Sequence, residues 1–156
     1  DFMKSIKDED WYANTLFVIM ADHSHGTPMD RRVAQKERFK IPMIWIGDVL
    51  KKEFRGKKHN KMGSHIDVAS SVLSQLELDY SKYYFGNNLF NQKSESIVPI
   101  AFHKGYGLIT NKANYAFSES YNKVLERNAI DSISHREIKN YAEMYFQHAF
   151  NKYLEL

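Results

Sequence analysis

Two short apolar runs, at residues 16–20 and 41–47, stand out in the first third of the chain. Both are rich in β-branched and aromatic residues and are bounded by polar residues, a pattern typical of strands that are buried on both faces of a sheet. Residues 14–21 and 41–47 are therefore predicted to form two buried strands. Pro42 lies at the start of the second strand, where its missing N–H is tolerated.

The last part of the chain shows strong helical periodicity. Apolar side chains recur at the i, i+3, i+4, i+7 spacing between residues 134 and 153, and they are Ile138, Tyr141, Ala142, Tyr145, Phe146, Ala149, Phe150 and Tyr153. This stripe predicts a helix over residues 134–153 that packs along its whole length. Ser134 and Glu137 have the spacing of a capping box, which predicts the start of the helix.

Two further helices are predicted. Residues 64–76 form the first of them, because Ser64 and Asp67 resemble a capping box and an apolar face follows. Its expected buried side consists of Ile66, Val68, Ala69, Val72, Leu73 and Leu76. The second covers residues 1–12, where Phe2, Met3 and Ile6 give one apolar face.

Short β-like runs occupy the middle of the chain, at residues 97–102, 107–110 and 114–117. Tight links between them predict an antiparallel meander. Polar or charged stretches at residues 24–40, 51–61 and 78–92 predict loops. The predicted fold is α/β, with a small antiparallel β appendage and a long C-terminal helix, in one partial domain. Its expected parts are residues 1–80, with the candidate metal site, 81–120, with the meander, and 121–156, with the terminal helix.

Composition narrows the chemistry. The chain has 156 residues, 43% of them hydrophobic and 26% charged, which is enough for one domain with a core. A net charge of +3 does not argue for nucleic acid and is compatible with an anionic substrate. Without cysteine, any metal must be held by His, carboxylate or hydroxyl groups, which suits Zn or Mn. No apolar run is long enough to span a membrane, and the N-terminus lacks the layout of a signal peptide.

Candidate metal ligands follow the first apolar run directly. Asp22, His23 and His25 lie at the carboxyl end of the predicted strand, where the chemistry of open α/β sheets is found. Neighbouring residues of a strand point to opposite faces, so Asp22 and His23 reach one site only if the backbone turns there. Gly26 and Pro28 supply such a turn. A carboxylate and an imidazole suit a divalent cation but leave its shell incomplete, and the alternative is a solvated loop.

Other polar residues are weaker candidates. His65, at the predicted helix start, is a candidate for a metal or substrate ligand, and the alternative is an ordinary surface histidine. Arg31 and Arg32 have the chemistry to clamp a phosphate, although a charged loop is usually just solvated. His103 and Lys104 lie in a tight link where they are candidates for binding an anionic headgroup. For these two residues a solvated hairpin turn is the favoured interpretation.

Three blocks of the sequence resemble a known superfamily. Residues 14–23, with the run Asn-Thr-Leu-Phe-Val-Ile-Met-Ala-Asp-His, resemble the late metal-binding strand of the sulfatase and alkaline phosphatase superfamily. Residues 39–47 look like the strand that follows there, and residues 64–76 look like the helix that then packs on the sheet. The most similar branch is the lipoteichoic-acid-synthase-like group of phosphoglycerol transferases and their sulfatase-like relatives. The resemblance covers roughly residues 1–117.

The resemblance implies a division of the active site. Asp22 and His23 match the Asp-His pair that binds the catalytic metal, Mn or Zn, in the family. The hydroxyl nucleophile and an acidic ligand belong to an earlier strand of the family that this chain does not contain. The chain would then be the C-terminal portion of an alkaline-phosphatase-like sheet, inactive by itself. Ala69-Ser70 stands where the family helix often carries Pro-Thr, a departure that concerns helix geometry.

Three functional hypotheses follow. In the first, the chain is a part of a metal-dependent phosphoglycerol or phosphoethanolamine transferase or of a sulfatase. The parent protein would be anchored in a membrane and act outside the cytoplasm on phosphate or sulfate esters, with a lipid headgroup as one possible part of the substrate. The second is a non-catalytic α/β module that binds a partner or an anionic polymer through the basic residues 51–61. The third is self-association through exposed strand edges. The chain starts without Met and in mid-helix, from which we expect a piece of a longer polypeptide.

Overall fold

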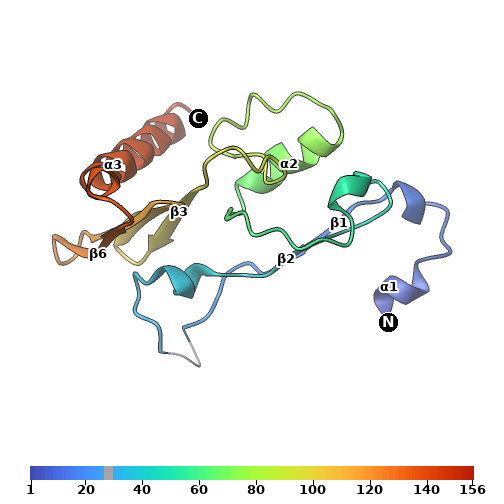
Figure 1. Cartoon of the computed structure of the whole chain (residues 1–156), viewed down its shortest axis with the longest axis horizontal. Helices are drawn as coiled ribbons and strands as arrows, with labels where there is room; N and C mark the ends of the chain where they lie inside the picture. Colours follow the sequence, from blue (N-terminus) through green and yellow to red (C-terminus); the bar gives the residue numbers. More distant parts are fainter. Residues whose placement is uncertain (27–29) are drawn as a thin grey trace.

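The computed structural model of the chain describes residues 1–26 and 30–156 (Figure 1). Three α-helices are present among the described residues, namely α1 (Phe2–Ser5), α2 (Asp67–Gln75) and α3 (Ser132–Leu154). The strands are β1 (Phe17–Met20), β2 (Met43–Ile46), β3 (Ile97–Phe102), β4 (Gly105–Thr110), β5 (Ala113–Ser118) and β6 (Lys123–Ala129). Short 3-10 turns are η1 (Tyr12–Asn14), η2 (Lys36–Phe39) and η3 (Lys52–Phe54). The mixed α/β class, the antiparallel appendage and the long terminal helix that the sequence predicts are confirmed.

Strands β1 and β2 form a two-stranded antiparallel sheet, with Phe17 opposite Ile46 and Met20 opposite Met43. Both predicted strands therefore exist. The prediction that they are buried on both faces is wrong, because Ile19 and Ile44 are 47% and 51% exposed. A continuous apolar run shows that both faces of a strand are apolar, but it does not show whether the same chain supplies the layers that cover them.

Strands β3 to β6 form a four-stranded antiparallel meander in sequence order. The sequence predicts three of these strands and misses β6, whose residues Lys-Val-Leu-Glu-Arg-Asn-Ala include few β-formers. As an edge strand, β6 tolerates polar residues on its exposed positions. It pairs with β5, and a bulge lies between Ala116 and Phe117. Strand β4 begins at Gly105, so only two residues link β3 to β4.

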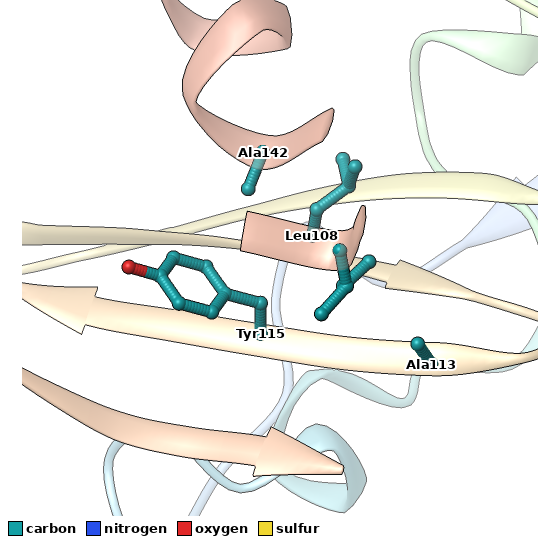
Figure 2. Close-up of a cluster of buried hydrophobic side chains, with 5 residues drawn as sticks. Leu108, Ala113, Tyr115 and Ala142 are labelled. Atoms are coloured by element: carbon teal, nitrogen blue, oxygen red, sulfur yellow. The ribbon is translucent and has the colours of Figure 1, made fainter. Parts of the chain in front are cut away.

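Helix α3 packs on the meander and forms the main core with it. The buried cluster consists of Leu108, Ala113, Tyr115, Ile138 and Ala142, the last two from the helix (Figure 2). The prediction that the apolar stripe packs along the whole helix is wrong, because Phe150 and Tyr153 are 57% and 70% exposed. A helix of 23 residues is about 34 Å long, whereas strands of six residues span about 20 Å. The helix therefore extends beyond the sheet that it covers.

Helix α2 buries its polar side, contrary to the sequence prediction. Its fully buried residues are Asp67, Ser70, Ser71 and Gln75, whereas Ile66 and Leu76 are 39% and 56% exposed. The segment of residues 78–92 folds back over the polar side and is held by hydroxyl groups. The Ser71 hydroxyl accepts a hydrogen bond from Leu89 N at 2.9 Å. Gly86 passes so close that a Cβ atom there would collide with the Ile66 carbonyl oxygen.

The N-terminal segment is not the single helix that the sequence predicts over residues 1–12. It contains only α1 and, after a turn region, η1. A short helix with a narrow apolar face is unstable without tertiary packing. Of the three apolar residues expected to form that face, only Ile6 is buried, with 7% exposure.

Candidate functional site

Asp22 and His23 follow the end of β1 and lie side by side on the surface. The backbone N–H of His23 donates to Asp22 Oδ1 at 2.9 Å, and His23 Nε2 lies 3.5 Å from Asp22 Oδ2. The His23 and Asp22 side chains are 76% and 87% exposed. Because β1 ends at Met20, the backbone is free to turn and bring both side chains to one place. The structure thus places the two side chains side by side, and their role as metal ligands stays a prediction.

One hydrogen bond of His23 bears on the roles of its two ring nitrogens. Nδ1 lies 3.0 Å from the Ser24 carbonyl oxygen, which can only accept, so Nδ1 carries the proton in this contact. Nε2 then presents a lone pair toward the Asp22 carboxylate. Two acceptors that face each other are satisfied by a proton on Nε2 or by a cation between them. The donor set, one imidazole nitrogen and one carboxylate, fits part of a Zn or Mn shell.

His65 is brought to the same strand end from a distant part of the chain. Its Nε2 lies 2.9 Å from the Ala21 carbonyl oxygen, although the two residues are 44 positions apart. Because a carbonyl accepts, Nε2 is the donor and Nδ1 is left for any other partner. His65 thus anchors the start of α2 beside Asp22. The weaker of the sequence candidates is placed next to the stronger ones, and its role as a ligand stays a prediction.

The three side chains do not complete a metal shell. Among residues 1–26 and 30–156, the structure gathers no group of three or more His, Cys, Asp or Glu side chains that could hold a metal ion. His25 is exposed and follows His23 by two positions. Pro28, the second residue that the sequence assigns to the turn, lies outside the described residues.

Arg32 is engaged within the protein through its side chain, and Arg31 through its backbone. Arg32 Nη2 forms an ion pair with Glu126 Oε1 of β6 at 2.7 Å, which ties the loop after β1 to the meander. The backbone N–H of Arg31 donates to the Gly26 carbonyl at 3.2 Å. The Arg31 carbonyl in turn accepts from Arg38 Nη1 at 3.0 Å. These contacts shape the loop, and a phosphate clamp by Arg31 and Arg32 remains a prediction.

His103 and Lys104 form the two-residue link between β3 and β4. Both are exposed, and Lys104 has a left-handed backbone with a φ of 50°. The Lys104 carbonyl accepts from Glu119 N at 2.9 Å, which joins this turn to the end of β5. The turn belongs to the meander and not to the β1–β2 sheet that carries Asp22. A tight exposed turn is the favoured sequence interpretation, and it is what the structure shows.

Asp67 is the residue whose importance the sequence understates. Its side chain is buried, and it accepts hydrogen bonds from Ser64 N at 2.7 Å and Asn87 N at 2.6 Å. Burial raises the pKa of Asp67, against the effects of these two bonds and of the nearby Lys61 charge. The Ser64-x-x-Asp67 spacing is the sequence signal that could have shown the importance of Asp67. Asp67 fixes the backbone at Ser64 and so positions the adjacent His65.

Lys61 is the cation that lies near Asp67. Its Nζ donates to the Ser94 carbonyl at 2.5 Å and to the Ser94 hydroxyl at 2.9 Å. Burial lowers the pKa of Lys61, and the Asp67 charge acts in the opposite direction. Lys61, Asp67 and their partners therefore hold together the start of α2 and the segment of residues 78–94 behind the candidate site.

Comparisons with known proteins give a single line of evidence on the fold. No family model matches the chain, and no curated protein matches it. A solved structure, described as a protein in the alkaline phosphatase superfamily from Vibrio parahaemolyticus, is similar with a TM-score of 0.64 and 17% sequence identity. The match covers 97% of this chain and 39% of that protein. At this identity the likeness concerns the fold alone, so the chain is folded like a part of that protein.

Proposed function

We propose that this chain is the part of a longer phosphate- or sulfate-ester enzyme that supplies Asp22 and His23 to a divalent metal. The observation that carries the proposal is the facing pair of acceptors, His23 Nε2 and Asp22 Oδ2, 3.5 Å apart at the end of a strand. The similarity in fold to a protein of the alkaline phosphatase superfamily supports it. The chain spans 39% of that protein, so the remaining ligands and the nucleophile belong, in this proposal, to another segment.

The metal would lower the pKa of a hydroxyl nucleophile and neutralise charge on the transferred phosphoryl or sulfuryl group. This chain's own contribution is to hold the ligands. The Ser24 carbonyl oxygen can accept a hydrogen bond from His23 Nδ1–H, and in that tautomer Nε2 is the nitrogen that would bind the metal. His65 holds the end of β1 through Ala21, so the position of Asp22 depends on the start of α2.

The finer assignment rests on the sequence resemblance. The resemblance points to a phosphoglycerol or phosphoethanolamine transferase or a sulfatase, whose parent is anchored in a membrane and acts outside the cytoplasm. The acceptor or leaving group would then include a lipid headgroup. None of the helices in the described part of the chain is long and apolar enough to cross a bilayer. An anchor, in this proposal, lies in the parent protein.

Metal titration of the chain is the direct test. Mn²⁺ added to the isotopically labelled protein should broaden the NMR signals of Asp22 and His23 first, because a paramagnetic ion relaxes the nuclei nearest to it. Asp22→Asn should weaken this effect on the order of tenfold, since a bound carboxylate charge is lost. Asp79→Asn is the matched control, because Asp79 is an exposed carboxylate in a loop, held by Ser81.

Two outcomes would contradict the proposal. One is uniform broadening with no preference for the end of β1. The other is an equal response of the Asp22→Asn and Asp79→Asn variants. In the parent protein, Asp22→Asn should abolish most turnover with a phosphate-ester substrate. Unchanged turnover would exclude Asp22 from the metal site.

A second candidate function is a non-catalytic module that binds an anionic polymer. It is favoured by Lys57 and Lys58, which are exposed and form no ion pair within the described residues. Exposed lysines bind polyanions in a salt-dependent manner. Replacing both lysines with Glu should abolish such binding, and a chelator should leave it unchanged. Binding that is lost with the chelator and retained in the double variant would instead favour the metal-dependent function.

A further inference from the structure

A groove lies between helix α3 and the meander, away from the Asp22–His23 pair. It has a volume of about 570 Å³, within the range of sites for small organic molecules. Residues of β3, β4, β5 and the helix line it, together with Phe85 from the segment of residues 78–92. The groove is separate from every residue that the proposed function uses.

Apolar side chains make up most of the groove. Leu108 and Ile138 are buried core residues at its base, with 2% and 3% exposure. Tyr141 and Met144 line it from α3 and are 59% and 70% exposed. These exposed apolar surfaces stand beside a preformed hollow, so a ligand with an apolar body removes them from water without rearranging the core.

Carboxylates outnumber lysine and arginine side chains around this apolar surface, which His148 also lines. Glu95, Asp131 and Glu137 line the groove together with Lys112. Lys112 Nζ is already paired with Glu95 Oε1 at 3.3 Å. Asp131 stays ionised, because its hydrogen bonds from Ser134 hold the pKa of its carboxyl below the usual value. Glu137 forms no ion pair within the described residues, so the groove keeps an excess of negative charge.

Aromatic rings add to this preference. Tyr145 lines the groove, and burial raises its pKa to about 12, so its ring stays neutral at physiological pH. Phe85 packs against Tyr145 with ring centroids 5.4 Å apart. Neutral aromatic faces attract organic cations through their quadrupoles. Charge and ring chemistry therefore favour the same class of ligand.

We propose that the groove between α3 and strands β3 to β5 binds a small organic cation, an ammonium group attached to an apolar chain or ring. The apolar body lies against Leu108, Ile138 and Tyr141. The ammonium group lies at the carboxylate end, next to Glu137. The size of the groove suits a small molecule, and the excess of carboxylates disfavours fatty acids and other apolar anions.

Three probes of equal chain length test the proposal. Octylamine, octanol and octanoate are cationic, neutral and anionic at pH 7. Each is titrated into the full chain while the methyl NMR signals of Ile133, Ile138 and Met144 are recorded. Octylamine should shift these signals at the lowest concentration and octanoate at the highest, with apparent Kd values that differ roughly tenfold.

Two variants separate charge from apolar contact. Glu137→Gln should weaken octylamine binding roughly two- to fivefold and leave octanol unchanged, because only the charge is removed. Glu143→Gln is the matched control on the same helix, since Glu143 pairs with Lys139 and does not line the groove. Tyr141→Ala should weaken all three probes, whereas Tyr153→Ala, also exposed on α3, should weaken none.

Three results would overturn the proposal. Octanoate could bind as tightly as octylamine, or Glu137→Gln and Glu143→Gln could respond alike. Finally, the groove methyl signals could stay unchanged at millimolar octylamine while the spectrum remains that of a folded protein. None of these results bears on metal binding at Asp22, so failure here and failure of the proposed function are distinguishable.

Discussion

Single side chains decide how the candidate site is held in place. Asp67 is buried, and each of its oxygens accepts a backbone N–H, from Ser64 and from Asn87. A carboxylate is the only common side chain of this size that offers two acceptors and no donor. Burial raises the pKa of Asp67, and these bonds and the Lys61 charge oppose that rise. The hydrogen bonds of Asp67 therefore stabilise both the start of α2 and the position of His65.

We expect Asp67→Asn to destabilise the protein by about 1–3 kcal/mol. The amide keeps one acceptor, but its NH2 group then faces a backbone N–H, and a buried donor is left unpaired. Chemical denaturation followed by circular dichroism measures the loss. Glu119→Gln, at an exposed position, should change stability by less than about 0.5 kcal/mol. Equal stability of the two variants would contradict the role of Asp67.

Tyr145 predicts a pH effect at the alkaline end. Burial, and to a smaller degree the Asp67 charge, raises its pKa to about 12 in the folded state from its ordinary value of 10.0. The folded protein then holds a proton that the unfolded chain releases, so stability is full below pH 10 and falls as the pH rises toward 12.

The Tyr145→Phe variant removes this titrating group and should flatten the decline. Denaturation curves measured between about pH 9 and 12 test the expectation. Tyr121→Phe is the control, because Tyr121 is 74% exposed. This variant should show the same decline in stability as the unsubstituted chain. A decline that is just as steep in Tyr145→Phe as in Tyr121→Phe would rule out this assignment.

At the scale of elements, the start of α3 shows how closely the sequence predicts the N-cap of a helix. The sequence predicts a capping box of Ser134 and Glu137. In the structure the N-cap is Asp131, whose Oδ1 accepts from Ser134 N at 2.7 Å and whose Oδ2 accepts from the Ser134 hydroxyl at 3.0 Å. The prediction misplaces the cap by three residues because Asp and Ser are both good caps, so the residue types alone do not select between them.

We expect Asp131→Ala to lower the thermal midpoint of unfolding more than Glu137→Ala does. The first change leaves N-terminal amide groups of α3 without an acceptor, whereas the second removes a side chain that takes no part in the cap. Thermal denaturation at neutral pH compares the two. Hydrogen bonds from Ser134 lower the pKa of Asp131. The cap should therefore weaken at acidic pH, when the Asp131 carboxylate becomes protonated. A larger effect of Glu137→Ala would restore the cap that the sequence predicts.

At the scale of the whole molecule, the apolar faces of the two sheets are buried to different extents. The meander and α3 share a core around Leu108, Tyr115 and Ala142. Within residues 1–26 and 30–156 the β1–β2 sheet has no comparable cover, since Ile19 and Ile44 are about half exposed. Apolar strands with free edges are templates for pairing with another chain. This asymmetry is compatible with the match to 39% of a longer protein.

The chain on its own should therefore self-associate through the β1–β2 sheet. We expect light scattering to show an apparent mass that rises with concentration. Ile44→Lys should reduce this rise, because a charge on the exposed face opposes stacking of two such faces. Ile130→Lys is the control, since Ile130 is 74% exposed and lies outside the β1–β2 sheet. An unsubstituted chain that stays monomeric at all concentrations would contradict the expectation.

The sequence by itself determined which segments form strands and helices wherever the periodicity is strong. The helix near residues 134–153, the strands near residues 16–20 and 41–47, and three strands of the meander follow from the spacing of apolar residues alone. It also placed Asp22 and His23 at the end of a strand. These features are local, because they depend on neighbours within a few positions of the chain.

The tertiary structure decided which faces are covered and which distant residues meet. Only the folded chain shows that α2 buries Asp67, Ser70 and Ser71 and that His65 reaches Ala21 across 44 positions. It also shows that a polar segment, β6, completes the meander. Burial and long-range hydrogen bonds depend on what the rest of the chain supplies at each surface, and periodicity along the sequence carries no record of that.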